Sequence, residues 1–223
     1  MEQITISYVP IQSLGYVICD VPKDIMEITQ EYIDDLIETK FQKAIKTNTY
    51  LAGAIEHEYN LGKLGPYLNS FFEKIIPEYF KITGNISLVD KKFKVSTPLY
   101  ESSFEYDIWV NIQKKHEYNP IHKHKGLVSF VYYVKIPYSM SEEKTFPSIR
   151  DSNTNNLPAF SFIYPNHSYY ESLSAVGEHK ILIDKSYEGK MLLFPSALQH
   201  SVTPFHTSDN YRISVAGNIV QAD

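Results

Sequence analysis

Two histidines, His122 and His124, stand one residue apart in NPIHKHKGLVSFVYYVKIP, which covers residues 119–137. In an extended strand, residues i and i+2 project from the same face, so the two imidazoles can point to one place. Neutral imidazole is the commonest protein ligand for transition metals. The pair alone is weak evidence, because a solvated strand end explains it equally well. A metal site requires a further ligand from elsewhere in the chain.

A later stretch, GKMLLFPSALQHSVTPFHTSDNYRISVAGN at residues 189–218, offers that ligand together with an anion site. His200 follows an apolar run that ends at Pro195, and it stands at the start of the next strand-like run. Arg212 opens the last predicted strand, and Ser214 shares its face two residues later. A guanidinium fork matches both oxygens of a carboxylate. We expect a metal site and a carboxylate site side by side.

The remaining histidines have no partner at ligand spacing. We expect them on the surface or in local hydrogen bonds: His57, His116, His167, His179 and His206. His206 is the main competitor of His200 for the role of third ligand. It falls in the turn-like PFHTSD, whereas His200 follows the apolar strand, so His200 is preferred.

The composition limits the class of protein. Apolar residues make up 43% of the 223 residues and charged residues 21%, which favours one globular domain over residues 1–223. A formal charge of −5 gives no general attraction for nucleic acid or anionic lipid, although it leaves a local basic patch open. The single Cys19 forms no intrachain disulfide, and MEQITISYVPIQ at the start resembles no signal peptide. We expect a soluble, cytoplasmic protein without nucleic-acid or membrane partners.

Helices are predicted in the first third and strands in the rest. Apolar residues recur at helical spacing over residues 23–45 and 65–83, with Pro77 expected to kink or interrupt the second helix. Two short strands are predicted within residues 3–19. Further strand-like runs lie at residues 106–113, 127–136, 159–164, 179–184, 190–194 and 212–220. Many short strands without intervening helices favour an antiparallel sandwich or barrel. The polar stretch 137–158, with Tyr138 and Phe146, is predicted to be a lid or a disordered loop.

The two histidine stretches, together with WVNIQ at 109–113, resemble the 2-oxoglutarate and iron(II)-dependent oxygenases. The resemblance is to the prolyl-hydroxylase-like branch, which includes small bacterial and phage-encoded members. The resemblance covers about residues 105–220, and LAGAIEHEYNL at residues 51–61 shows a weaker resemblance. It implies a mainly β fold: a double-stranded β-helix, which is a cupin-like jelly roll, over residues 85–223, with residues 1–84 as helical support.

The resemblance also implies roles for particular residues. His122, His124 and His200 would be the metal ligands, and Arg212 would pair with the distal carboxylate of 2-oxoglutarate. Three groups of weaker candidates would support the cosubstrate: Ser214, Tyr133, and the pair Asn111 and Asn218. The implied cofactors are Fe(II) and 2-oxoglutarate, and the implied reaction is O₂-dependent hydroxylation of an unactivated C–H bond. The family-level expectation for the substrate is a peptidyl proline or another protein side chain, with a small molecule as the alternative. The oligomeric state is open, and a homodimer is one option.

One position departs from the wider superfamily, where the first motif is H-x-D or H-x-E. Here it is His122-Lys-His124. If His124 binds, three neutral imidazoles leave the full charge of +2 on the metal, which favours a dianionic cosubstrate. If His124 stays off the metal, the additional open position resembles that of iron halogenases. We favour ligation by all three.

Two other classes of protein explain part of the pattern. A cupin-like three-histidine metalloprotein, either a dioxygenase or an isomerase that does not use 2-oxoglutarate, accounts for the histidines but does not require Arg212 and Ser214. A non-catalytic structural jelly roll would make the histidines incidental. Binding of 2-oxoglutarate in the presence of Fe(II) separates the oxygenase from both.

Overall fold

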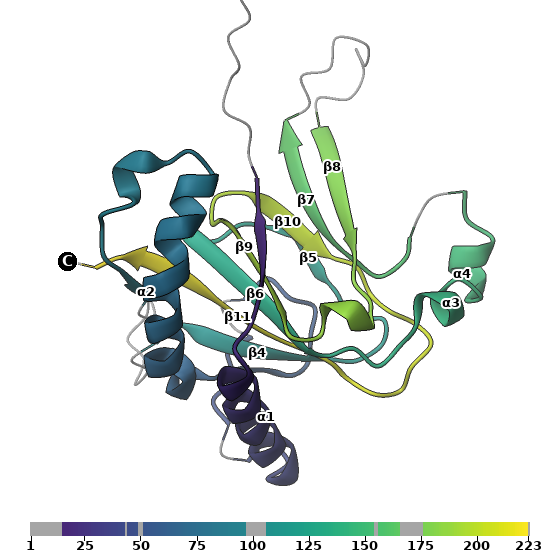
Figure 1. The fold of residues 1–223 in the computed structure, drawn as a ribbon. Helices are drawn as coiled ribbons and strands as arrows, with labels where there is room; N and C mark the ends of the chain where they lie inside the picture. Colours follow the sequence, from purple (N-terminus) through teal and green to yellow (C-terminus); the bar gives the residue numbers. More distant parts are fainter. Residues whose placement is uncertain are drawn as a thin grey trace, which may run out of the picture.

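The computed structural model describes residues 15–42, 44–48, 51–96, 106–153, 156–165 and 176–222. These residues form two antiparallel sheets that face each other (Figure 1). The larger sheet has the order β1-β9-β6-β11-β4-β2, with β3 paired to β11, and the smaller has the order β5-β10-β7-β8. The larger sheet contains β1 (Val17–Asp20), β2 (Glu58–Asn60), β3 (Phe93–Val95), β4 (Ile108–Gln113), β6 (Val128–Lys135), β9 (Lys190–Pro195) and β11 (Arg212–Gln221). The smaller sheet contains β5 (Asn119–His122), β7 (Ala159–Pro165), β8 (Val176–Leu182) and β10 (Gln199–Val202).

From β4 onward the chain passes repeatedly between the two sheets. Strands β4, β6, β9 and β11 belong to the larger sheet, and the strands between them belong to the smaller one. This alternation is the jelly-roll arrangement that the family resemblance implies, and it is one form of the antiparallel sandwich or barrel that the strand pattern predicts. The first 84 residues contribute strands as well as helices, because β1 pairs with β9 and β2 pairs with β4.

Strand β6 is buried on both faces, which explains its almost continuous apolar sequence. Phe130 and Tyr132 belong to the core beneath the helices, where the Tyr132 hydroxyl lies 2.9 Å from Thr29 Oγ1 on α1 (Lys23–Glu38). Val131 and Tyr133 belong to the second core, between the sheets. The alternation of side chains therefore directs Tyr132 toward the helices and Val131 and Tyr133 toward the cavity, which Phe130 also lines.

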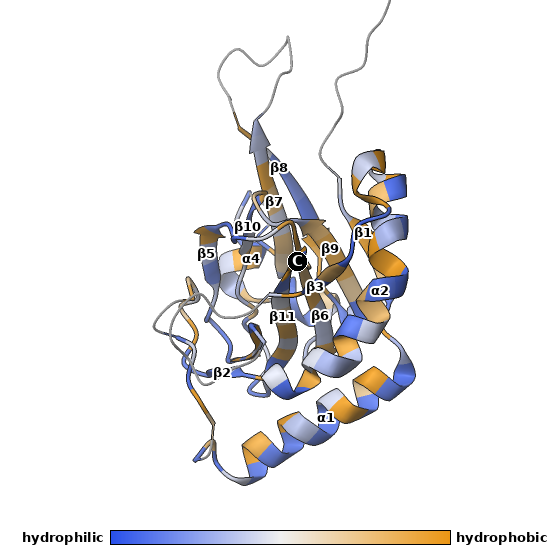
Figure 2. Ribbon diagram, turned by 90° about the vertical axis from the view of Figure 1, so that its left-hand side faces the viewer, coloured by the Kyte–Doolittle hydropathy of each residue, from blue (hydrophilic) through white to orange (hydrophobic). Residues whose placement is uncertain are grey.

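Helices α1 and α2 (Gly65–Ile82) lie on the same side of the larger sheet (Figure 2). The prediction of an interruption at Pro77 is wrong, because α2 runs through it. Ile76, Tyr79 and Phe80, on either side of this proline, are buried, so tertiary packing holds the helix together despite the missing N–H. Helix α1 ends at Glu38, earlier than predicted.

The segment between Pro137 and Pro158 contains two short helices, α3 (Met140–Glu143) and α4 (Pro147–Arg150), rather than one long loop. The buried Glu143 side chain accepts hydrogen bonds from the backbone amides of His206 and Thr207 and from the Thr207 hydroxyl. These bonds attach the segment to the loop before β11. Short turns of 3₁₀ helix complete the described elements, at Gly62–Leu64, Ile86–Leu88 and Lys185–Tyr187.

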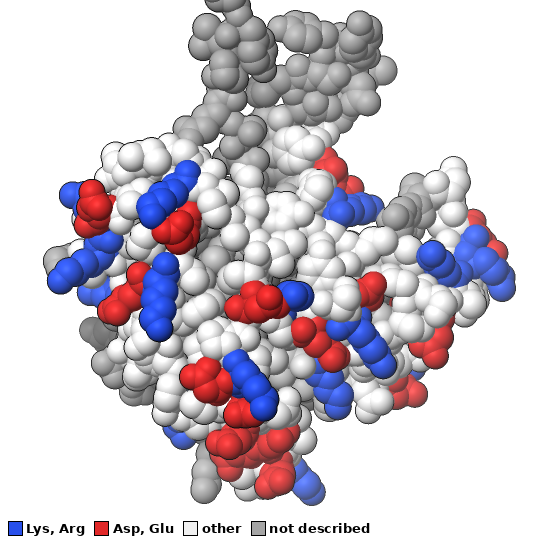
Figure 3. Space-filling view, in the orientation of Figure 1, with Lys and Arg blue, Asp and Glu red and all other residues white. Residues whose placement is uncertain are grey.

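Charged side chains of both signs are mixed over most of the face shown in Figure 3, while acidic side chains gather over α1 at the bottom of the view. Several opposite charges on the surface pair directly, as do Lys190 and Asp20, or Lys115 and Asp209. No helix among the described residues is both long enough and apolar enough to cross a membrane.

Candidate active site

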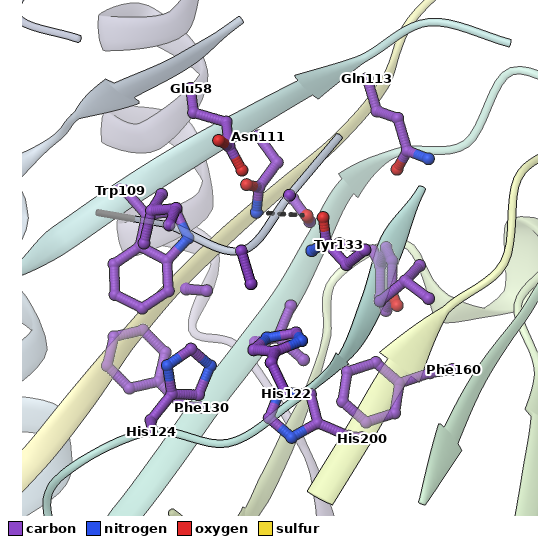
Figure 4. Close-up of a pocket in the computed structure, with 18 of the residues that line it drawn as sticks. Glu58, Trp109, Asn111, Gln113, His122, His124, Phe130, Tyr133, Phe160 and His200 are labelled. Atoms are coloured by element: carbon purple, nitrogen blue, oxygen red, sulfur yellow. Dashed lines mark hydrogen bonds between the residues drawn. The ribbon is translucent and has the colours of Figure 1, made fainter. Parts of the chain in front are cut away.

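Three of the predicted site residues, His122, His124 and His200, meet between the two sheets at one end of the cavity (Figure 4). His122 ends β5 and lies directly opposite His200 on β10 in the antiparallel register. The ring centroids of His122 and His200 are 4.2 Å apart, and that of His124 is 4.9 Å and 5.1 Å from them. One ring nitrogen from each histidine lies within 4.8 Å of the corresponding nitrogens of the other two.

Backbone carbonyls orient two of these rings. Nδ1 of His122 lies 2.7 Å from the carbonyl oxygen of Pro120, and Nδ1 of His200 lies 2.9 Å from that of Leu198. A carbonyl oxygen only accepts, so in each neutral ring Nδ1 carries the proton and Nε2 keeps its lone pair. This is the usual arrangement that fixes the tautomer of a metal-binding histidine.

The same three imidazoles are held neutral. Burial lowers the pKa of His124 to about 4, with the nearby His122 adding to the effect. Burial and His122 lower the pKa of His200 to about 3, and burial also lowers the pKa of His122. Because a protonated imidazole has no lone pair for a metal, this shift favours ligation at neutral pH.

Arg212 lines the same cavity with a side chain that is only 1% exposed. Its Nε and Nη2 donate to Gln113 Oε1 at 3.1 and 2.7 Å, Nη1 lies 3.1 Å from the Tyr138 hydroxyl, and Nη2 also donates to the carbonyl of Thr203. These partners are neutral, and no aspartate or glutamate of the described chain forms an ion pair with Arg212. A buried cation with only neutral partners favours binding of an anion.

Next to Arg212, a row of polar side chains crosses the larger sheet. Tyr133 on β6 pairs with Ser214 on β11, which pairs with Asn111 on β4. Asn111 Nδ2 donates to Ser214 Oγ at 3.4 Å, but the buried Tyr133 hydroxyl and Asn111 Oδ1 have no hydrogen-bond partner among the described residues. Buried polar atoms are seldom left unpaired, so these two indicate space for a polar ligand.

The other predicted candidates lie elsewhere. Asn218 does not line the cavity and accepts a hydrogen bond of 2.7 Å from Ser129, further along β11. His206 is not part of the three-histidine cluster, and its Nδ1 lies 2.9 Å from Nδ1 of His116. His57 stacks on Phe41 and His179 contacts Tyr16. His167 lies outside the described residues.

Several cavity residues were not singled out from the sequence. The ring centroids of Trp109 and His124 are 5.5 Å apart, and Phe160 stacks on His200 with a centroid distance of 5.2 Å. Trp109 and Gln113 share the face of Asn111 in the predicted strand, so alternation would have found them. Glu58 lies on a strand of three residues, too short for a periodic signal.

These features fit an iron and 2-oxoglutarate site. Three neutral imidazoles with free lone pairs suit Fe(II). The buried guanidinium and the unpaired Tyr133 hydroxyl suit a carboxylate in the same cavity. The rings of Phe160 and Phe194 pack against His200, so one side of the cluster is apolar.

Comparisons with known proteins agree with this geometry. Residues 107–218, half of the chain, match a family model described as "Putative 2OG-Fe(II) oxygenase". Among solved structures, a prolyl-4-hydroxylase from Pseudomonas putida is similar, with 11% identity, coverage of 95% of each chain and a TM-score of 0.50. A prolyl hydroxylase from Trichoplax adhaerens, solved in complex with a hypoxia inducible factor oxygen degradation domain peptide fragment, shows 14% identity, coverage of 95% of this chain and 84% of that one, and a TM-score of 0.51. At such identities the two structures show a shared fold. No curated protein matches.

The family match favours the oxygenase over the cupin-like metalloprotein and the structural jelly roll. It also confirms the cofactors and cosubstrate expected from the sequence. The chain belongs to the 2-oxoglutarate and Fe(II)-dependent oxygenase family, and it is an oxidoreductase that uses Fe(II), 2-oxoglutarate and O₂.

Proposed function

We propose that His122, His124 and His200 hold Fe(II), and that Arg212 and Tyr133 hold the distal carboxylate of 2-oxoglutarate. The enzyme then hydroxylates an unactivated C–H bond of a peptidyl proline or another protein side chain. One observation carries the assignment of residues: three imidazoles converge within 4.8 Å in the same cavity as a buried arginine that has no acidic partner among the described residues.

Bound iron, with its 2-oxoglutarate, supplies the oxidising power by coupling decarboxylation to succinate and CO₂ with reduction of O₂. The chain supplies orientation, charge and a dry cavity. The carbonyls of Pro120 and Leu198 keep Nε2 of two ligand rings free, and Arg212 balances the charge of the cosubstrate. Ser214 and Asn111 lie beside the Tyr133 position and support the same carboxylate or the substrate next to it.

The proposed substrate class is supported by the fold that the chain shares with two prolyl hydroxylases. The segment 137–158 is the proposed cover of the cavity. The support for this placement is one contact: the hydroxyl of Tyr138 lies 3.1 Å from Nη1 of Arg212. A cytoplasmic location and a homodimer stay predictions, and light scattering tests the second.

Anaerobic titration with Fe(II) and 2-oxoglutarate tests the assignment of residues. The wild-type protein should give a weak metal-to-ligand charge-transfer band in the green, and His200→Ala should lose it. His206→Ala is the matched control, since it removes an imidazole outside the cluster and should keep the band. Arg212→Gln should weaken 2-oxoglutarate binding by at least about 30-fold, because a buried charge pair is broken. A wild-type protein without the band, or an Arg212→Gln variant with unchanged affinity, would contradict the proposal.

A further inference from the structure

The polar row that crosses the larger sheet ends in a buried carboxyl group that the proposed function does not use. Glu58 on β2 pairs directly with Asn111 on β4, and so continues the row that begins at Tyr133. Its side chain lines the cavity, and the residue is 1% exposed. In Figure 4, Glu58 and Asn111 lie beside each other, away from the three histidines. Glu58 therefore belongs to a different end of the cavity from the proposed metal.

This end of the cavity is rich in acceptors. Oε2 of Glu58 accepts from Asn48 Nδ2 at 3.1 Å, and this is the one side-chain donor to Glu58 among the described residues. Asn111 Oδ1 and Asn119 Oδ1 are both buried, and neither has a hydrogen-bond partner in the part of the chain that the structure describes. A ligand that satisfies them has to bring N–H or O–H donors.

Gly53 brings the backbone unusually close to these oxygens. A Cβ at this position would lie 2.4 Å from Glu58 Oε1 and 2.6 Å from Asn119 Oδ1. The two oxygens therefore lie close to the same side of Gly53, although they come from different strands. A glycine at this position lets the segment 51–53, which also lines the cavity, lie against the two oxygens without displacing their side chains.

The charges around Glu58 do not balance its own. No lysine or arginine in the described part of the chain forms an ion pair with it, and the proposed function assigns the charge of Arg212 to 2-oxoglutarate. Burial, with the charge of Glu117 as a smaller cause, raises the pKa of Glu58 to about 7. Such a carboxyl group gains from a cation that enters with its own N–H donors.

We infer that Glu58, Asn111 and Asn119 form a substrate subsite that binds a cationic N–H group, the ammonium of a lysine or the guanidinium of an arginine, at or next to the hydroxylated residue. The inference rests on the proposed function and narrows its substrate class to basic peptide segments. The alternative is that Glu58 is a neutral, structural carboxylic acid that binds nothing.

Short peptides separate these two possibilities. The set is acetyl-Gly-Gly-X-Gly-Gly-amide with X as lysine, arginine, norleucine, glutamine or proline, and the readout is peptide-dependent formation of succinate by the iron-loaded enzyme. We expect the lysine or arginine peptide to exceed the norleucine peptide by at least about tenfold in kcat/KM. In Glu58→Gln this ratio should fall to near one.

Glu56→Gln is the matched control, because Glu56 is an exposed carboxylate two residues away that pairs with Lys114 outside the cavity. It should keep the wild-type ratio. Thermal melting checks that both variants fold. The charge-transfer band, measured on the same samples, distinguishes failure of the proposed function from failure of the subsite. Absence of the band in wild type overturns the proposed function. If the band is present, then equal rates for lysine and norleucine peptides, no stimulation by any basic peptide, or an unchanged ratio in Glu58→Gln overturns the subsite alone.

Discussion

Replacing Glu58 by glutamine should change how stability depends on pH. The carboxyl group is 1% exposed, and its pKa is raised from 4.5 to about 7. Between these two values the folded state holds a proton that the unfolded state has lost. The stabilisation from this proton is complete below pH 4.5 and is lost as the pH rises through 7. A difference of this size corresponds to about 3 kcal/mol.

Glutamine has nearly the same shape and cannot ionise. We therefore expect Glu58→Gln to gain about 3 kcal/mol relative to wild type between pH 4.5 and pH 8, which is roughly 6–12 °C in Tm for a chain of this size. Urea unfolding of both metal-free proteins at several pH values in this range measures the difference directly. Every other titrating group is common to both proteins, so its contribution cancels.

Glu56→Gln is again the control, since Glu56 is exposed and its hydrogen bond with Lys114 lowers its pKa. It should show no gain toward high pH. Parallel pH profiles for wild type and Glu58→Gln would mean that Glu58 is ionised in the folded protein at all these pH values. The account of an unbalanced buried carboxyl would then be wrong.

Three further outcomes are expected. Metal-free protein should lose stability as the pH falls from about 6.5 toward 3, because His200 takes up a proton in the unfolded chain but stays neutral in the folded protein, where its pKa is about 3. Because the folded ring stays neutral, iron measured after gel filtration should still be bound below pH 6. Complete release of iron by pH 6 would contradict this. Tyr133→Phe should weaken 2-oxoglutarate binding by about tenfold in calorimetry without lowering Tm, since the hydroxyl has no hydrogen-bond partner among the residues that the structure describes; an unchanged affinity would remove Tyr133 from the site. Glu143→Ala should cost about 2–4 kcal/mol in urea unfolding, because the amides of His206 and Thr207 lose their acceptor; a loss below about 0.5 kcal/mol would show that the segment 137–158 is held by other contacts.

The larger part of the fold could be predicted from the sequence because its strands carry strong local signals. Strands β4, β6, β9 and β11 are apolar and buried, and each lies within a few residues of its predicted place. Strands β2 and β5 carry no such signal. They are three and four residues long, and they exist because longer neighbours offer them hydrogen bonds.

The candidate site could be predicted as far as spacing and strand alternation reach. Alternation places Ser214 on the face of Arg212, and both residues line the cavity, whereas Tyr133 follows from the family resemblance alone. It could not show how far along β11 the cavity extends, so Asn218 was included although it binds Ser129 instead. Glu58 was missed because its relation to Asn111 is a pairing between strands about fifty residues apart, which a single sequence does not record.

The direct pairing of His122 with His200 across two adjacent strands has a consequence for assembly of the smaller sheet. A slip of one residue between β5 and β10 would turn one of the two rings to the opposite face. An ion bound by both rings would therefore stabilise only one register of these two strands. In protein made under iron starvation, the smaller sheet should therefore be less stable. Amide hydrogens in β5 and β10 should then exchange faster, before those of the larger sheet do.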